Sequence, residues 1–214
     1  MMIGLAGGYC AGKNRVASML EARGWACIDV DRLGHEAIDL ARDAIAARFG
    51  PGVLAPDGSV DRRAVARLIF ADPLALADQE AIVHPVAIRL LEGRIAEEED
   101  RARAAGGEAR ICVNAALLHR SGIIASFDAI IEVRAPLPVR VLRGMRRDKA
   151  SPAAALARIR AQRSFGAELR AAARAEGKAV IVLRNPGGPF SLDRGLDRAL
   201  EKVEAALRRR ASAG

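Results

Sequence analysis

A glycine-rich stretch near the N-terminus carries the strongest chemical signal in the chain. Residues 7–14 read Gly-Gly-Tyr-Cys-Ala-Gly-Lys-Asn, between an apolar run at 2–6 and a helical pattern at 15–22. Such a loop points successive backbone N–H groups at phosphate oxygens, and its lysine reaches the β and γ phosphates. The stretch predicts a nucleoside-triphosphate site; a glycine-rich turn with a chance lysine is the alternative. The residues expected to contact the nucleotide are Gly7, Gly8, Tyr9, Cys10, Ala11, Gly12, Lys13, Asn14 and Arg15.

Asn14 departs from the usual form of this loop, in which a serine or threonine hydroxyl coordinates Mg²⁺. An amide oxygen is an acceptable hard ligand for Mg²⁺, so Asn14 is the candidate metal ligand. Two alternatives stay open. Asn14 holds the metal only through water, or the site has lost its Mg²⁺-dependent chemistry.

Two carboxylates follow the second apolar run, in the sequence Asp29-Val30-Asp31. Strand alternation places both on the same side of the predicted strand, at its C-terminal end and next to the glycine-rich loop. A carboxylate there can orient an attacking hydroxyl or accept its proton. The structural alternative is that Asp31 caps a helix at 32–40.

Five short apolar runs alternate with Ala-, Arg- and Leu-rich segments of helical character. The runs lie at 2–6, 26–30, 111–115, 129–133 and 179–183. Nearly continuous apolar runs are typical of parallel strands that are covered on both faces. The alternation predicts a three-layer α/β/α fold of the P-loop nucleoside-triphosphate hydrolase type, with a five-stranded parallel sheet.

Two connections are longer than simple crossovers. Residues 31–110 separate the second and third runs and contain helical patterns at 33–49, 61–70 and 73–105. We expect a helical insertion at the C-terminal edge of the sheet, where α/β folds bind ligands. The arginine-dense segment 140–174 predicts a second insertion before the last strand.

The composition excludes several classes of protein. The 214 residues carry a formal charge of +8, but aromatic residues make up only 3%, too few for the stacking platforms of single-strand nucleic-acid binders. A phosphorylated small molecule fits the same charge. The three cysteines, Cys10, Cys27 and Cys112, suit neither a disulfide framework nor a close-spaced zinc site. No apolar run reaches membrane-spanning length. We predict a cytoplasmic protein with no nucleic-acid, membrane or obligate protein partner.

The order of the motifs resembles the dephospho-coenzyme A kinase family over residues 2 to about 190. The phosphate loop alone is shared by many folds, whereas the ordered set is far more specific. The matching stretches are Ile3-Gly4-Leu5-Ala6-Gly7-Gly8, Gly12-Lys13, Ile28-Asp29-Val30-Asp31, Phe49-Gly50, Asp57-Gly58-Ser59-Val60-Asp61-Arg62, Ile69-Phe70-Ala71-Asp72, His84-Pro85, Leu117-Leu118, Arg143 with Arg146-Arg147-Asp148, Arg158-Ile159 with Gln162, and Asn185-Pro186-Gly187.

The resemblance implies ATP-dependent, Mg²⁺-assisted phosphorylation of the ribose 3′-hydroxyl of dephospho-coenzyme A. It also implies three parts: a core domain (1–32 with 107–141 and 177–214), a helical acceptor domain (33–106) and a lid (142–176). Lys13, Asp31 and Arg143 are then the expected catalytic residues, with Asp31 facing the 3′-hydroxyl. The other implied contacts are Arg62 and His84 to the acceptor, Arg147 to the transferring phosphate, and Asn185 and Gly187 to the adenine of ATP.

Each implied role has a structural alternative. His84 before Pro85 would otherwise be a buried histidine bonded to backbone, and Arg143, Arg146 and Arg147 would be a solvated helix face. Cys10 is interpreted as a small packed residue rather than a redox switch.

The chain also departs from the family pattern. Asn14 replaces the metal-binding hydroxyl, Asn114 replaces an aspartate after the third strand, Arg120 replaces a glutamate, and Val180 replaces an aspartate in the last strand. Fewer acidic groups should weaken Mg²⁺ binding. Two rival functions therefore stay open: another small-molecule or nucleotide kinase of this fold, and a catalytically weakened ATP-binding regulatory module.

Overall fold

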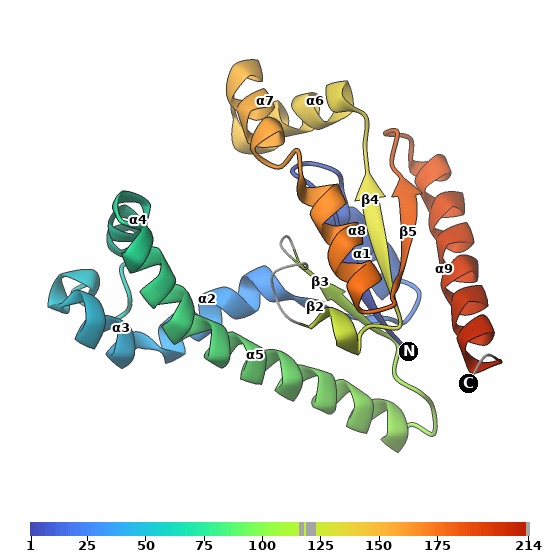
Figure 1. The fold of residues 1–214 in the computed structure, drawn as a ribbon, viewed down its shortest axis with the longest axis horizontal. Helices are drawn as coiled ribbons and strands as arrows, with labels where there is room; N and C mark the ends of the chain where they lie inside the picture. The colour runs from blue at the N-terminus through green and yellow to red at the C-terminus, as the bar shows by residue number, and fades with distance from the viewer. Residues whose placement is uncertain (116–117, 119–122, 213–214) are drawn as a thin grey trace. The chain divides into compact units, whose positions relative to one another are not determined.

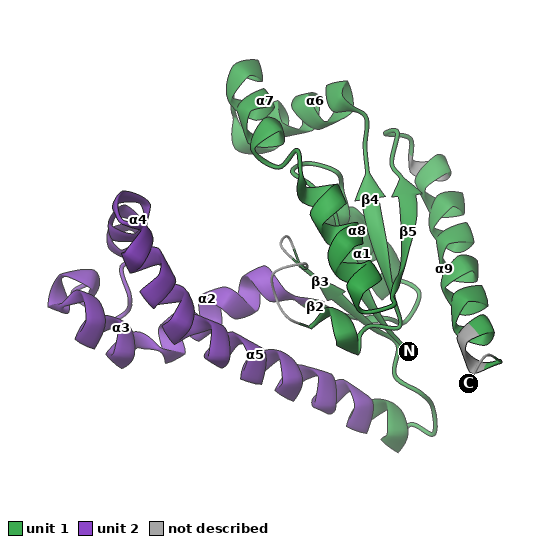
Figure 2. Ribbon diagram, in the orientation of Figure 1, with its two compact units in different colours: residues 1–28, 101–214 green, residues 29–100 purple. Residues whose placement is uncertain are grey.

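The computed structural model describes residues 1–115, 118 and 123–212, and it divides into two compact units (Figure 2). Unit 1 comprises Met1–Ile28 with Arg101–Gly214, and unit 2 comprises Asp29–Asp100. Unit 1 contains the sheet and the helices around it, while unit 2 is helical (Figure 1).

The sheet has five strands in the order β2-β3-β1-β4-β5. Their bounds are β1 (Met2–Ala6), β2 (Ala26–Asp29), β3 (Ile111–Asn114), β4 (Ala129–Arg134) and β5 (Ala179–Arg184). The central strand β1 pairs in parallel with β3 on one side and β4 on the other, and β4 pairs in parallel with β5. The predicted three-layer α/β fold with a five-stranded parallel sheet is confirmed.

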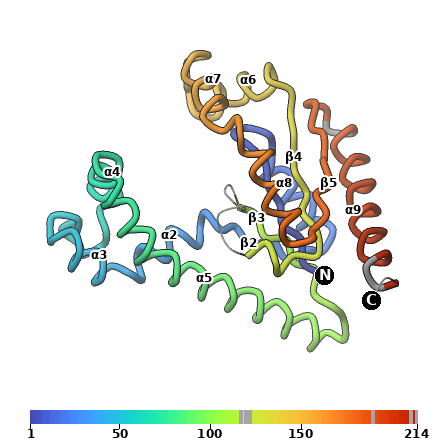
Figure 3. The backbone as a smooth tube through the Cα atoms, in the orientation of Figure 1, coloured from blue at the N-terminus to red at the C-terminus, as the bar shows by residue number. Residues whose placement is uncertain are grey.

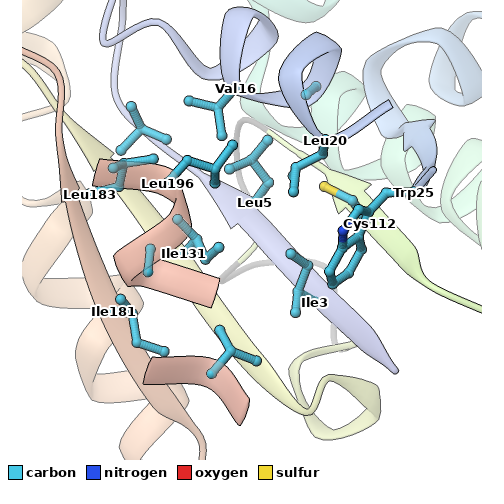
Figure 4. Close-up of a cluster of buried hydrophobic side chains, with 14 of the residues drawn as sticks. Ile3, Leu5, Val16, Leu20, Trp25, Cys112, Ile131, Ile181, Leu183 and Leu196 are labelled. Carbon is cyan, nitrogen blue, oxygen red and sulfur yellow. The ribbon is translucent and has the colours of Figure 1, made fainter. Parts of the chain in front are cut away.

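One face of the sheet is covered by helices α1 (Lys13–Glu21) and α9 (Pro189–Ala211). Ile3 and Leu5 of β1 pack there with Val16 and Leu20 of α1 and with Leu196 of α9 (Figure 4). Burial of these apolar side chains holds both helices against the strands.

Helix α8 (Phe165–Ala175) covers the opposite face. Gly4 alternates with Ile3 and Leu5 and therefore points to that face, where an added Cβ would come within 3.1 Å of Phe127. Glu132 of β4 also points there and is ion-paired with Arg170 of α8. These two faces with the sheet between them make the three layers.

Three helices connect β4 to β5: α6 (Leu137–Asp148), α7 (Pro152–Ala161) and α8. Figure 3 shows the chain leaving β4, turning through α6 and α7, and returning along α8 to β5. Ser151 ends the α6–α7 turn, and its hydroxyl accepts a hydrogen bond from the backbone N–H of Ala154.

Unit 2 contains helices α2 (Val30–Leu40), α3 (Arg42–Phe49), α4 (Arg62–Ala71) and most of α5 (Pro73–Ala104), with a short 3₁₀ turn, η1 (Pro51–Val53). Its own small core includes Ala37, Ile45, Val53, Val65 and Val83. The carboxylate of Asp61 caps α4 by accepting from the backbone N–H groups of Arg63 and Ala64.

Three details of the predicted elements were wrong. The helix predicted at 33–49 is interrupted at Ala41, whose φ of −86° and ψ of 9° end α2 and begin α3. Helix α1 begins at Lys13 rather than at residue 15. The second strand ends at Asp29, because the next residue already begins α2.

Among the residues that the structure describes, no helix is long and apolar enough to span a bilayer.

Candidate active site

The glycine-rich loop spans residues 7–12, between the end of β1 and the start of α1. At two of its positions the neighbouring atoms leave no room for a Cβ, so only glycine fits. A Cβ on Gly7 would lie 2.9 Å from the backbone oxygen of Val133, and a Cβ on Gly12 would collide with the side chain of Asn185. Gly12 also has a φ of +100°, which L side chains rarely adopt. The loop therefore has the tight conformation that its sequence pattern predicts.

Lys13 begins α1 and already has a partner at the sheet edge. Its Nζ donates a hydrogen bond of 2.6 Å to Oδ1 of Asn114, which is the last residue of β3 and is 3% exposed. A neutral amide oxygen holds the ammonium less strongly than a carboxylate would, so the lysine is released more readily to a phosphate.

Arg143 and Asn185 form a bonded pair behind the loop. Nη2 of Arg143 donates to Oδ1 of Asn185 at 3.0 Å, and Nη1 donates to the carbonyl of Ala11 at 3.2 Å. Asn185, only 1% exposed, donates from Nδ2 to the same Ala11 carbonyl at 2.9 Å. The alternative of a solvated face is therefore wrong for Arg143, whose guanidinium is bonded to the loop.

Two residues of the α6–α8 region hold Tyr9. The backbone N–H of Tyr9 donates to Oε1 of Gln162 at 2.6 Å, and its carbonyl accepts from Nε of Arg140 at 2.8 Å. Burial lowers the pKa of Arg140 from its ordinary value. The loop is thus fixed from α6 and from the residue after α7.

Two arginines lie close to the ring of Tyr9. The guanidinium carbons of Arg147 and Arg158 are 5.1 and 5.6 Å from the ring centroid. The Tyr9 hydroxyl donates to Asp148 at 2.5 Å, and that carboxylate also pairs with Arg147 at 2.7 Å and Arg158 at 2.6 Å. We name Tyr9, Arg147, Asp148 and Arg158 the Tyr9 cluster.

Electrostatics within the Tyr9 cluster follow from these contacts. Hydrogen bonds from Arg147 and Tyr9 hold the pKa of Asp148 well below its usual range. The hydrogen bond to Asp148 raises the pKa of Tyr9, so the phenol stays protonated. The guanidinium of Arg147 is therefore paired with Asp148 and lies over the ring of Tyr9 in this structure. Arg146 is exposed.

The remaining predicted nucleotide residues lie around the loop. Cys10 is buried and in the left-handed region with φ 56°, which agrees with a packed residue. Asn14 and Arg15 are exposed on the first turn of α1. Gly187, two residues after Asn185, has a φ of +119°.

The candidate acceptor residues all belong to unit 2. Asp31 is exposed in the first turn of α2, not on the strand, so the strand-alternation argument for the two carboxylates was wrong. The predicted cap was also assigned to the wrong residue, because Oδ1 of Asp29 accepts from the backbone N–H groups of Asp31 and Arg32. Asp29 ends the strand and starts the helix.

Arg62 and His84 lie on α4 and α5. Nη2 of Arg62 pairs with Asp39 at 2.7 Å and donates to the carbonyl of His35 at 3.4 Å. His84 is exposed beside Pro85, so the alternative of a buried histidine is wrong.

The predicted departures from the family are only partly visible. Asn114 is the partner of Lys13, and Val180 lies half-buried in β5. Leu117, His119 and Arg120 lie outside the described residues. Within residues 1–115, 118 and 123–212, no group of three or more His, Cys, Asp and Glu side chains could hold a metal ion.

The sequence interpretation gave no role to Arg140 or to the side chain of Tyr9. A signal for Arg140 was present, because residues 140, 143 and 147 follow the 3–4 spacing of one helix face. The Tyr9 cluster joins residues 139 positions apart, and no local pattern reveals such a contact.

Comparisons with known proteins agree on one family. A family model described as dephospho-CoA kinase matches residues 1–185. Dephospho-CoA kinase of Moorella thermoacetica is 44% identical over 81% of this chain and 81% of its own length, and that of Anaeromyxobacter dehalogenans is 38% identical over 98% and 95%.

Two solved structures share the fold. A protein from Thermus thermophilus, 32% identical, superposes with a TM-score of 0.75 over 97% of both chains. Dephospho-CoA kinase from Campylobacter jejuni superposes with a TM-score of 0.68 at 19% identity, over 94% of this chain and 96% of that one.

Proposed function

The chain belongs to the dephospho-CoA kinase family, and from this premise we propose which of its residues carry each part of the reaction. The activity is ATP-dependent phosphorylation of dephospho-CoA, in coenzyme A biosynthesis. Within it, the loop and Lys13 hold the phosphates of ATP, unit 2 presents the acceptor, and a carboxylate receives the proton of the acceptor hydroxyl.

The proposal for nucleotide binding rests on one observation, the hydrogen bonds that Lys13, Arg143 and Asn185 make around the loop. The backbone N–H groups of residues 7–13 bind phosphate oxygens, and Lys13 leaves Asn114 to neutralise charge between the β and γ phosphates. Arg143 stabilises the charge that develops on the transferring group. Asn185 and Gly187 border the adenine.

The donor set at this edge fits Mg²⁺ that arrives bound to ATP. The Asn14 side chain is exposed on the first turn of α1, and its amide oxygen is a hard ligand. We assign the protein ligand to Asn14. When bound, the metal would neutralise phosphate charge, and Asn14 would be the residue that holds it.

Asp31 is the proposed acceptor of the proton from the ribose 3′-hydroxyl. As the 3′-oxygen forms its bond to the γ-phosphorus, the bond between that phosphorus and the β,γ-bridging oxygen breaks and ADP leaves. Asp31 is exposed, and no residue among those described pairs with its carboxylate. Arg62 and His84 provide the positive and hydrogen-bonding groups that orient the acceptor.

Arg147 completes the proposed site by moving from the Tyr9 cluster to the transferring phosphate. Its side chain is 61% exposed, so the exchange of partners needs no unfolding. We propose that the protein works in the cytoplasm, a reducing compartment that suits its three free cysteines. We propose no obligate protein partner.

The experiment is ADP release from ATP and Mg²⁺, measured with and without dephospho-CoA, with identification of the product. We expect release that depends on the acceptor and yields coenzyme A. ATP binding without any release, at saturating Mg²⁺, would support the regulatory module suggested by Asn14 and Asn114. Release with nucleoside monophosphates but not with dephospho-CoA would support another kinase of this fold.

A further inference from the structure

Two of the three cysteines lie side by side in the sheet. Strands β2 and β3 are neighbours, and the backbone N–H of Ala26 donates to the carbonyl of Arg110 at 2.8 Å. In a parallel ladder this hydrogen bond places Ala26 opposite Ile111, and therefore Cys27 opposite Cys112. Residues that lie opposite each other on neighbouring strands point to the same face. The two thiols therefore project from adjacent positions on one face of the sheet.

Helix α1 covers the two thiols. Cys112 is fully buried in the core cluster that contains Leu20 and Trp25 (Figure 4), and Cys27 packs against the same cluster. The Cys27 thiol donates to the carbonyl of Ala17 on α1 at 3.4 Å. A hydrogen bond with Cys27, and then burial, raises the pKa of the Cys112 thiol well above its usual range. The two thiols are therefore in contact beneath α1.

The separation of the two positions suits a disulfide. Neighbouring strands lie about 4.8 Å apart, and the Cα atoms of a disulfide are usually about 4.4–6.8 Å apart. Both cysteines are free in this structure. Cysteine spacing did not predict the pair, because it joins strands that are distant in the sequence and adjacent only in the sheet.

The cysteine pair lies against both elements that hold the lysine of the phosphate loop. Ala17, which accepts the hydrogen bond from Cys27, lies about one turn after Lys13 on α1. Cys112 lies two residues before Asn114 on β3, and Asn114 accepts the hydrogen bond from Lys13. A shift of β3 or of α1 at the cysteine pair therefore changes the position of Lys13.

We propose that Cys27 and Cys112 are a modification site at which hydrogen peroxide forms a reversible disulfide that slows phosphoryl transfer. The thiolate of Cys27 attacks one peroxide oxygen, the O–O bond breaks, and a sulfenic acid and water form. The sulfur of Cys112 then attacks the sulfenic sulfur, the S–S bond forms, and the sulfenic oxygen leaves as a second water. Both thiols are oxidised, their protons pass to the two waters, and the peroxide is reduced.

The order of attack follows from exposure. Cys27 is half-buried and meets the peroxide first, whereas Cys112 is buried and meets only Cys27. The disulfide is the second step because the sulfur of Cys112 already contacts that of Cys27.

The disulfide should displace the residues around Lys13. The Cβ atoms of a disulfide lie about 3.8 Å apart, so β2 and β3 must approach each other by about 1 Å. A displacement of about 1 Å can lower the rate of a positioned reaction by as much as about a hundredfold. Oxidation also removes the hydrogen bond from Cys27 to Ala17. The effect on turnover rests on the proposed role of Lys13, whereas formation of the disulfide does not.

Peroxide treatment of the full chain tests the cross-link itself. Trypsin releases the two cysteines in separate peptides, residues 24–32 and 111–120, and Cys10 in a third, residues 1–13. After oxidation, blocking of free thiols and digestion without reduction, mass spectrometry should show peptide 24–32 joined to peptide 111–120. Dithiothreitol should return both peptides to the free form.

Turnover of dephospho-CoA tests the consequence. In wild type, kcat should fall about tenfold on oxidation and recover with dithiothreitol. Cys27→Ser cannot form the disulfide, and its hydroxyl can still donate to Ala17. It should therefore keep the same kcat before and after peroxide. Cys112→Ala is the second variant and should also be insensitive to peroxide. Cys10 remains in both variants, so they control for oxidation elsewhere, and thermal unfolding of the reduced proteins checks that each one folds.

Three results would overturn the inference. They are the absence of the joined peptides, a joined protein with unchanged kcat, or an equal loss of kcat in wild type and Cys27→Ser after peroxide. A reduced wild-type protein that makes no coenzyme A would instead refute the proposed function, and the joined peptides would still test the cysteine pair.

Discussion

The two units hold their candidate residues in different ways. In unit 1, the side chains of Lys13, Arg143 and Asn185 make hydrogen bonds of 2.6 to 3.2 Å around the loop. In unit 2, Asp31 and His84 are exposed, and no described residue pairs with their side chains, whereas Arg62 is paired with Asp39 at 2.7 Å. On the proposed assignment, the groups around the loop are held by one another, whereas two of the three acceptor groups are held by no described residue.

This difference has a chemical reason. Phosphoryl transfer depends on positioning and on charge neutralisation around the phosphates, so groups that contact the triphosphate benefit from being fixed in advance. A group that meets the attacking hydroxyl is useful only when an acceptor is present. A site that forms fully with both ligands wastes less ATP on water.

The largest expected effect is at Lys13. Lys13→Ala should lower kcat by about 10³-fold, because it removes the charge that neutralises the β and γ phosphates. Steady-state ADP release measures this effect. Lys202→Ala, at an exposed position on α9, is the control and should leave kcat unchanged. Equal loss in both variants would contradict a specific role for Lys13.

Variants of Asp31 and Asp29 distinguish a catalytic role from a helix-capping role. Asp31→Asn should lower kcat by about a hundredfold, since an amide cannot accept the hydroxyl proton. Asp29→Asn should change kcat by less than about threefold, because asparagine caps a helix as well as aspartate does. Parallel kinetic assays and urea unfolding compare the two. Near-normal turnover of Asp31→Asn would contradict the assignment of Asp31 as the acceptor of the hydroxyl proton.

Asn185 tests whether the nucleotide side is assembled in advance. Asn185→Ala takes away the acceptor of Arg143 Nη2 and leaves the Ala11 carbonyl with only the longer hydrogen bond from Arg143 Nη1, which costs about 1–3 kcal/mol. We expect KM for ATP to rise about tenfold and the midpoint of thermal unfolding to fall. The exposed neighbour Arg184 supplies the control, Arg184→Ala. A normal KM for ATP with an intact fold would mean that the network is not part of the nucleotide site.

The smallest expected effect concerns pH and the Tyr9 cluster. The pKa of Asp148 is lowered in the folded protein, so its stabilising contribution is complete above the ordinary aspartate pKa of about 4 and is lost as pH falls below it. The midpoints of thermal unfolding of wild type and Asp148→Asn should therefore differ at about pH 6 and converge toward about pH 2. A constant difference across that range would show that ionisation of Asp148 contributes nothing.

The conformation of the glycine-rich loop was largely predictable because its signal is local. The spacing of Gly7, Gly12 and Lys13 between a strand and a helix specifies a loop that few other backbones satisfy. The five strands were also predictable, because the apolar runs that indicate them are local in the sequence. By contrast, the hydrogen bond from Lys13 to Asn114 joins residues 101 positions apart, so only the sheet order brings them together.

The strand-end carboxylates show why boundaries are harder to predict. Alternation is valid only while the strand continues, and the side chain of Asp29 ends it by capping α2. One residue of difference moves Asp31 from a strand to a helix. A cavity beside the loop was also beyond prediction, because its rim combines arginines from β4, α6, α7, α8 and the turn after α7.

Hydrogen–deuterium exchange with each ligand alone tests the contrast between the two units most directly. A nonhydrolysable ATP analogue with Mg²⁺ should protect amides of residues 7–15 and 185–187, with little change in unit 2. Dephospho-CoA should instead protect segments around Asp31, Arg62 and His84. Protection of unit 2 by the ATP analogue to the same degree as by dephospho-CoA would contradict the account.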